Sequence, residues 1–191
     1  MREGSTAGSR ATTSVVHVFV LGVDPGVSRC GYAVLEARPG GARARAIGVL
    51  TTSPADPLHR RLAELQGELR GLLHEFRPAA LAVERVLFQQ NVRTAISVGQ
   101  ASGIAMAEAA ACGCAVEQYS PNQVKEAVAG YGGATKEQMQ DMVQTLLGLT
   151  ERPRPADAAD AAAVALCHLA IAPVHAASAR AARGSNGGGA S

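Results

Sequence analysis

The residues best placed to do chemistry in this chain are a few acids at widely separated positions. Asp157 and Asp160 lie three residues apart in RPADAADAAAVALCHLA, an alanine-rich stretch that predicts a helix. Residues at this spacing share one helix face, so the two carboxylates point the same way. Such a pair is tolerable where a cation lies between the charges. It is equally typical of a helix's first turn, where aspartates act as caps.

Two more acids follow apolar runs that predict buried strands. Asp24 comes directly after VVHVFVLGV, although in DPG it could simply begin a turn. Glu84 follows LAV, where a charge without a partner would be costly. If these strands are parallel neighbours, both acids lie at the carboxyl edge of the sheet, where open α/β sheets bind ligands. Four acids can then converge, namely Asp24, Glu84, Asp157 and Asp160.

The remaining pattern supplies the elements that would position these acids. Short connections predict antiparallel hairpins among the first three strands, and a helix before the fourth strand allows it to lie parallel to the first. We therefore expect an α/β fold with a five-stranded mixed sheet flanked by helices. The predicted strands cover 16–23, 30–37, 44–52, 80–86 and 114–120, and the predicted helices cover 57–76, 91–112, 120–130, 135–149 and 156–172.

Composition indicates one globular domain. The chain has 191 residues, of which 47% are hydrophobic and 18% charged, enough for a sizeable core. We expect an N-terminal extension without fixed structure at 1–15, the folded domain at 16–173 and a flexible tail at 174–191. The net charge of +2 means that any nucleic-acid surface must be local. The four cysteines lack metal-site spacing and predict unpaired thiols in a reducing cytoplasm. No stretch approaches the ~18 apolar residues of a membrane span.

Four segments, taken in order, resemble the RuvC family of Holliday-junction resolvases. They are LGVDPGVSRCGYAVLE, LAVERVLFQQNVRTAISVGQASG, YSPNQVKEAVAGYGGATKEQM and ADAADAAAVA, and the likeness covers roughly residues 18 to 173. The resemblance implies an RNase H-like fold and a homodimer that cuts four-way DNA junctions in recombination and repair. It implies paired, symmetric, Mg²⁺-dependent nicks that leave 5′-phosphate and 3′-hydroxyl ends. It also places the catalytic, metal-binding acids at Asp24, Glu84, Asp157 and Asp160.

The expected chemistry accounts for the choice of carboxylates. Phosphodiester hydrolysis needs an activated water and a stabilised leaving oxygen, and two divalent ions about 4 Å apart provide both. Mg²⁺ prefers oxygen ligands and keeps several waters, so a few carboxylates suffice. We expect two Mg²⁺ ions in each active site, with Mn²⁺ as an alternative ion.

Lysine usage gives a second indication of the site. The chain has sixteen arginines but only two lysines, Lys125 and Lys136, beside the caps of consecutive predicted helices. The ordinary interpretation is two solvated surface charges. The resemblance instead matches both to lysines at the DNA-facing edge of the active site, where they would contact phosphate and stabilise the transition state.

The loop LFQQN after Glu84 is the expected base-probing element. The family tends to carry an aromatic residue three positions after its glutamate, whereas here that position is Leu87 and the aromatic Phe88 follows it. Phe88 is predicted to contact DNA, with core packing as the alternative. Asn91 and Arg93 begin the next helix and would either contact phosphate or serve as cap and solvated charge.

Partners and competing functions follow from the same residues. The helix at 91–112 is rich in small residues, so one face can pack on the sheet while another, by resemblance, forms a two-fold dimer. Family analogy adds the RuvA and RuvB branch-migration complex and a cytoplasmic, nucleoid-associated location. A non-catalytic junction binder would gain nothing from clustered acids facing phosphate. A sugar-kinase-like phosphotransferase, suggested by D-x-G-x-x-x-x-G at Asp24, Gly26 and Gly31, would need a second domain.

Overall fold

The computed structural model describes residues 18–85 and 92–185, apart from the side chains of 92–94 and 173–185. Its elements match the predicted order, and apart from the end of α5 their bounds differ by a few residues. They are β1 (Phe19–Asp24), β2 (Arg29–Arg38), β3 (Gly41–Thr51), α1 (Leu58–Phe76), β4 (Ala80–Glu84), α2 (Val92–Ala111), β5 (Ala115–Tyr119), α3 (Pro121–Ala129), α4 (Lys136–Leu147) and α5 (Ala156–Ser185).

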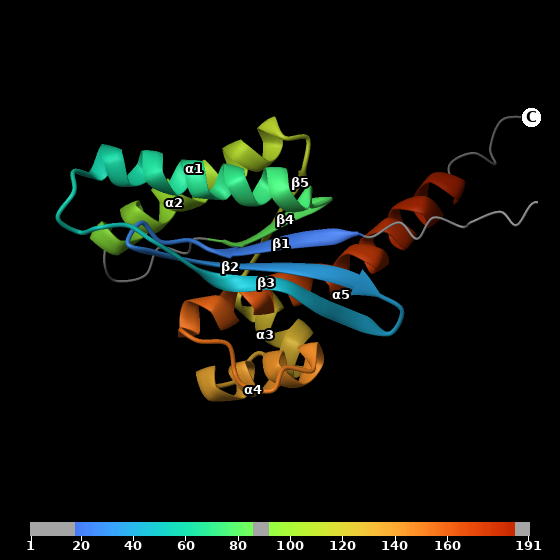
Figure 1. Cartoon of the computed structure of the whole chain (residues 1–191). Helices are drawn as coiled ribbons and strands as arrows, with labels where there is room; N and C mark the ends of the chain where they lie inside the picture. Colours follow the sequence, from blue (N-terminus) through green and yellow to red (C-terminus); the bar gives the residue numbers. More distant parts are fainter. Residues whose placement is uncertain (1–17, 86–91, 186–191) are drawn as a thin grey trace, which may run out of the picture.

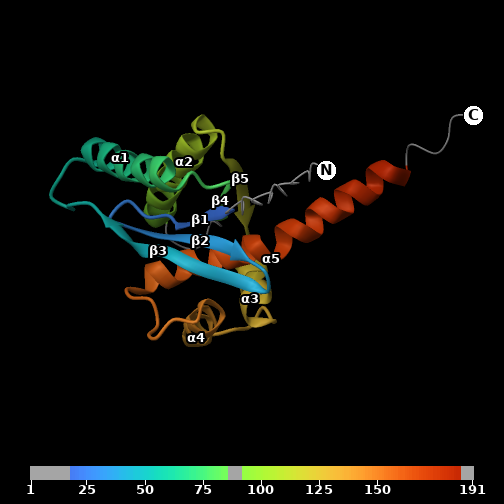
Figure 2. The ribbon, with the colours of Figure 1, turned by 45° about the vertical axis from the view of Figure 1, so that its right-hand side comes forward.

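The last helix is longer than the sequence predicted. α5 continues to Ser185, past the expected end at residue 172, and Pro173 lies inside it. A proline removes a backbone donor from the helix, which favours an end at that point. The segment that follows, VHAASARAARGS, is rich in alanine, the residue with the highest helix propensity, and this favours continuation. In Figures 1 and 2 this end of α5 runs away from the sheet.

The sheet has the predicted mixed topology, with strand order β3-β2-β1-β4-β5. β1 pairs antiparallel with β2, and β2 pairs antiparallel with β3, whereas β1–β4 and β4–β5 are parallel. Val23 lies opposite Val83, so Asp24 and Glu84 follow at the carboxyl ends of neighbouring parallel strands. On the other side of β1, Asp24 faces Gly31 of β2.

Helices cover both faces of the sheet. Figure 1 shows α1 and α2 on one face and α3, α4 and α5 on the other. Side chains alternate along β1 and so pack on both faces of the sheet. Leu21 and Val23 pack with the buried leucines of α1, while Val20 packs with α5. Asp24 has the same parity as Val20 and therefore faces the α5 layer.

Two glycines let α5 lie directly against the strands. A Cβ atom at Gly22 would lie 2.2 Å from the carbonyl oxygen of Ala161, and one at Gly31 would lie 2.0 Å from the carbonyl oxygen of Asp157. Real Cβ atoms do not approach a carbonyl oxygen so closely. The first turns of α5 can therefore sit beside the end of β1 because neither strand carries a side chain at these points.

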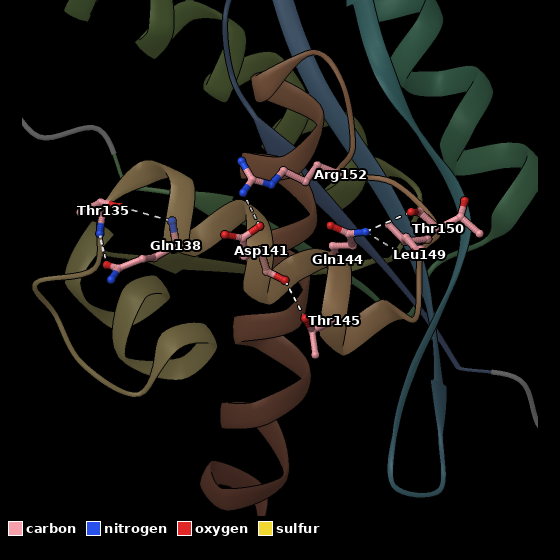
Figure 3. A network of polar contacts seen from close by, with 8 residues as sticks. All are labelled: Thr135, Gln138, Asp141, Gln144, Thr145, Leu149, Thr150 and Arg152. Atoms are coloured by element: carbon pink, nitrogen blue, oxygen red, sulfur yellow. Dashed lines mark hydrogen bonds and ion pairs between the residues drawn. The ribbon is translucent and has the colours of Figure 1, made fainter.

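The segment that leads into α5 is fixed by contacts with α4, which Figure 3 shows from close by. The Gln144 side-chain amide donates to the backbone carbonyls of Leu149 (3.3 Å) and Thr150 (3.1 Å). Arg152 forms an ion pair with Asp141 at 2.5 Å. These contacts orient the chain just before Asp157.

Helix starts on the same side of the sheet are capped by side chains. Ser120 caps α3 and Thr135 caps α4, and each makes a capping box with a glutamine three residues later. Pro121 occupies the first position of α3, where the backbone N–H that proline lacks would have no partner within the helix. These caps place Lys136 as the first residue of α4, with Lys125 one helix earlier.

The remaining expectations concern thiols and membranes. Cys30, Cys112, Cys114 and Cys167 are all free, which confirms the prediction of unpaired thiols. In the part of the chain that the structure describes, none of the helices combines the length and apolar character needed to cross a bilayer.

Candidate active site

The structure brings the four candidate acids to one edge of the sheet. Asp24 and Glu84 end β1 and β4, while Asp157 and Asp160 lie in the first turns of α5. The negative charges of Asp160, Glu84 and Asp157 each raise the pKa of Asp24. All four carboxylates therefore belong to one electrostatic site, although α5 is distant from both strands in the sequence.

Asp24 and Glu84 form the inner pair of this site. Burial and, after it, the charges of Asp160, Glu84 and Asp157 together raise the pKa of Asp24 to about 7, and Lys136 opposes the rise. Burial and the charge of Asp160 likewise raise the pKa of Glu84, whereas Lys125 and Lys136 lower it. Neither carboxylate makes a hydrogen bond or ion pair with a described residue. The inner pair thus carries negative charge that the protein only partly compensates.

Asp157 and Asp160 form the outer pair, and each is held by a cation. Arg29 donates to Oδ2 of Asp157 from Nε at 2.9 Å and lies within 2.7 Å through its terminal nitrogen Nη2. Lys136 Nζ lies 3.0 Å from Oδ2 of Asp160. The two carboxylate side chains are 31% and 32% exposed, while Arg29 and Lys136 are 51% and 57% exposed. The outer acids therefore face solvent with their charges paired.

A hollow of about 250 Å³ beside the acids contains both lysines of the chain. Its polar lining consists of Glu84, Asp160, Lys125 and Lys136, and apolar side chains of α3, α4, α5 and the connection before α4 form the rest. Acids and ammonium groups meeting in one hollow can hold cations and a phosphate at the same time. Positive charge beside the acids is what a phosphodiester in an acidic site needs.

Sequence reasoning missed Arg29 and the network that holds its turn. Arg61 of α1 donates to Ser28 Oγ at 2.5 Å and to Thr52 Oγ1 at 2.9 Å. Thr52 in turn donates to the carbonyl of Val27 at 2.6 Å. The sequence carries no signal for this contact. In the structure Arg29 lies two residues before Gly31, so strand alternation puts both on the α5 face.

The donor atoms of the site decide which metal ion could bind there. Within residues 18–85 and 92–172, no group of three or more His, Cys, Asp or Glu side chains is arranged so that it could hold a metal ion by itself. Mg²⁺ is commonly bound through one or two carboxylates together with waters and substrate phosphates, so a three-residue cage is not required. The oxygen-only donors and the excess negative charge at Asp24 both fit a hard divalent cation.

Several predicted DNA contacts lie outside the described residues. Leu87, Phe88 and Asn91 fall in the undescribed segment 86–91, and Arg93 lies in α2 with its side chain not described. The base-probing loop therefore stays a prediction.

The small residues of α2 divide between two faces. Ala101, Ala105 and Ala109 are buried against the α1 layer, whereas a Cβ at Gly99 or Gly103 would meet nothing within 4 Å. The predicted packing face is confirmed. The other face, which Ile96 continues, is exposed.

Comparison with known proteins decides the family. The family model for crossover junction endodeoxyribonuclease RuvC matches residues 20–168. The RuvC protein of Moorella thermoacetica is 47% identical over 156 residues, which cover 82% of this chain and 93% of the relative. That of Salinispora arenicola is 50% identical over 151 residues, which cover 78% and 86%. This chain belongs to the RuvC family.

Solved structures agree with this assignment. Thermus thermophilus RuvC in complex with its Holliday junction substrate is similar with a TM-score of 0.80 and 39% identity, over 83% of this chain and 97% of that one. The yeast mitochondrial resolvase Ydc2, at 17% identity and a TM-score of 0.60, shows the fold alone. The predicted RNase H-like fold is confirmed. As a RuvC-family member the chain is a nuclease that hydrolyses DNA phosphodiester bonds, not the phosphotransferase that the D-x-G motif also suggested.

Proposed function

We propose that this RuvC-family nuclease resolves four-way DNA junctions by paired, symmetric, Mg²⁺-dependent nicks that leave 5′-phosphate and 3′-hydroxyl ends. The observation that carries the proposal is the convergence of Asp24, Glu84, Asp157 and Asp160 beside two lysines. In the cell this activity would serve homologous recombination and DNA repair. We further propose that the protein works in the cytoplasm at the nucleoid.

The four carboxylates would hold the divalent ions. The raised pKa of Asp24, caused by burial and by three neighbouring acids, reflects negative charge that a bound cation would offset. Two ions in such a site would supply an activated water and stabilise the leaving oxygen. The inner acids would bind from the sheet edge and the outer acids from α5, with water and substrate phosphate completing the shell. Mn²⁺ has the same preference for oxygen ligands and would substitute.

Lys125 and Lys136 would act on the phosphate. Both line the hollow next to Glu84 and Asp160. A compact ammonium held near a phosphodiester neutralises charge that grows in the transition state. Lys136 is held by Asp160 in the free enzyme, and its side chain is more than half exposed, so it would be free to turn toward phosphate.

DNA contacts beyond the scissile phosphate would come from the loop after Glu84. We propose that Phe88, or Leu87 in its place, probes bases near the crossover by stacking or wedging. Asn91 and Arg93 would contact phosphates at the start of α2.

A homodimer suits this substrate. A symmetric junction presents two equivalent strands, and a two-fold dimer presents two equivalent active sites. The exposed face of α2, where Gly99 and Gly103 leave open space, would allow close approach of a second α2. By family analogy, the RuvA and RuvB branch-migration complex would deliver the junction.

The deciding experiment uses a synthetic four-way junction with Mg²⁺, the wild type and Asp157→Asn. We expect both proteins to bind the junction and only the wild type to cut it in paired strands. Glu75→Gln, which removes an exposed acid of α1, is the control and should cut normally. Sealing of the products by DNA ligase would test the 5′-phosphate and 3′-hydroxyl ends. Equal cutting by Asp157→Asn would remove Asp157 from the site, and no cutting by the wild type across varied core sequences would overturn the proposal.

A further inference from the structure

We infer that Arg29 is an internal counter-ion of Asp157 that competes with divalent cations and so sets the metal concentration that the enzyme needs. This rests on the proposed function, because it assumes that Asp157 helps to bind those ions. It assigns the role of a competing counter-ion to a residue outside the acids and lysines that the family resemblance pointed to.

The contact between Arg29 and Asp157 has a specific geometry. Two guanidinium nitrogens, Nε at 2.9 Å and Nη2 at 2.7 Å, lie against the single oxygen Oδ2. Oδ1 takes no part in this ion pair. The guanidinium therefore neutralises the carboxylate without enclosing it, and a cation approaching Asp157 meets a positive charge already in place.

The backbone around Arg29 is held firmly, so the contact is built into the fold. Arg61 of α1 donates to Ser28, the residue before Arg29. On the other side, Gly31 brings β2 against the backbone of Asp157, with room for no side chain between them. The main chain of Arg29 is thus fixed beside α5, while its side chain is 51% exposed and can turn outward.

Stability is a poor explanation for this ion pair. An ion pair between partly exposed groups contributes little to folding, because water screens the charges and both side chains lose rotamer freedom. The α5 helix is already fixed to the sheet by Gly22, Gly31 and the contacts before Asp157. The ion pair between Arg29 and Asp157 instead affects the negative charge of the site, because Asp157 is one of three acids that raise the pKa of Asp24.

The consequence for metal binding has a definite sign. A guanidinium next to Asp157 repels a divalent ion, so the free enzyme binds metal more weakly than the carboxylates alone would. DNA phosphate offers the guanidinium a second anionic partner, for which its remaining donors are suited. Arg29 turning toward phosphate would leave Asp157 to the metal, so metal and DNA should each strengthen binding of the other.

The test measures Mn²⁺ binding to the metal-free enzyme without DNA, from the electron paramagnetic resonance signal of unbound Mn²⁺. Arg29→Gln should bind Mn²⁺ about tenfold more tightly than the wild type. Arg29→Lys, which keeps the charge, should stay close to the wild type. Arg60→Gln removes the same charge from an exposed position on α1 and is the matched control, with unchanged binding expected. Thermal unfolding of each variant would establish that it is folded.

Each outcome decides between alternatives. A merely structural role for Arg29, holding Asp157 in place for the metal, predicts weaker Mn²⁺ binding in Arg29→Gln, and that result or unchanged binding would overturn the inference while leaving the proposed function intact. Asp24→Asn tests the site itself and should lose Mn²⁺ binding. If the wild type and Asp24→Asn bind Mn²⁺ equally, or neither binds it, the metal site of the proposed function fails and the inference fails with it.

Discussion

The inner and outer pairs of acids reach the same site by different means. Asp24 and Glu84 end adjacent parallel strands, so the sheet register alone places them side by side. Asp157 and Asp160 arrive on a helix that must dock across the sheet, through the glycines of β1 and β2. The inner acids have no hydrogen-bonding or ionic partner among the described residues, while each outer acid holds an exposed cation.

This difference indicates a division of labour. A buried, poorly compensated pair attracts a cation strongly but weakens the fold, as its raised pKa values show. A solvent-facing pair with its own counter-ions is nearly neutral at rest and can exchange those cations for metal or phosphate. The inner pair would thus anchor the ions, and the outer pair would make their binding depend on what else enters the site.

Gly31→Ala should separate the outer pair of acids from the inner pair. The new Cβ would lie 2.0 Å from the carbonyl oxygen of Asp157, so α5 must move and the outer pair must separate from the inner pair. We expect a loss of about 3 kcal/mol in the free energy of unfolding, together with the loss of cleavage. Urea denaturation and junction cleavage would measure both.

Gly67→Ala is the matched control for this change. Gly67 lies within α1, and a Cβ there would meet nothing within 4 Å. Alanine should stabilise the helix by about 0.5–1 kcal/mol and leave cleavage intact. A Gly31→Ala enzyme as stable and active as the wild type would show that α5 does not need its close approach to β2.

Lys125→Ala would test a cation that acts on the inner pair of acids. Lys125 lowers the pKa of Glu84 by its charge, with no ion pair to an outer acid. We expect cleavage about ten- to a hundredfold slower, with the free energy of unfolding changed by no more than about 0.5 kcal/mol. Single-turnover cleavage and thermal unfolding are the measurements. Glu126→Gln, on the next residue of α3, is the control, and an unchanged rate in Lys125→Ala would return Lys125 to ordinary surface.

The pH dependence of stability should separate the two pairs. In the metal-free enzyme the folded-state pKa of Asp24 is raised from 3.8 to about 7, so the folded state holds this proton more tightly than the unfolded state. The stability that protonation provides is complete below about pH 4 and is lost as pH rises through 7. We expect this group to lower the free energy of unfolding by about 2 kcal/mol across that window, because partial exposure screens the full shift.

Two variants test the assignment by urea denaturation at several pH values. Asp24→Asn should remove most of the decrease and be the more stable protein near pH 8. Asp157→Asn should keep most of it, because Asp157 contributes least among the three acids that raise the pKa of Asp24. The opposite ranking would mean that the poorly compensated charge lies on the outer pair.

Much of this site could be predicted because its determinants are local or periodic. Apolar runs ending in Asp24 and Glu84, with a crossover helix between them, fix two parallel strand ends at one edge. Capping at Ser120 and Thr135 is short-range chemistry, because each cap involves residues no more than three apart in the sequence. The end of α5 could not be read in the same way, because Pro173 and the alanine-rich segment after it indicate opposite outcomes.

Contacts between distant segments could not be predicted from the sequence. Nothing near Arg29 indicates Asp157 as its partner, since the two lie 128 residues apart and meet only where β2 and α5 pack. Arg61 likewise looks like one more charge on an amphipathic helix, although it fixes the turn before Arg29.

The sequence by itself determined the order of elements, the kinds of side chain in the site and which acids end which strands, because periodicity and turn chemistry act over a few residues. Only the tertiary structure decided how the charges are paired, because this depends on how closely two glycines let a helix approach the sheet. Electrostatic energy varies with ångström-scale distance and burial, and these are set when distant segments pack together.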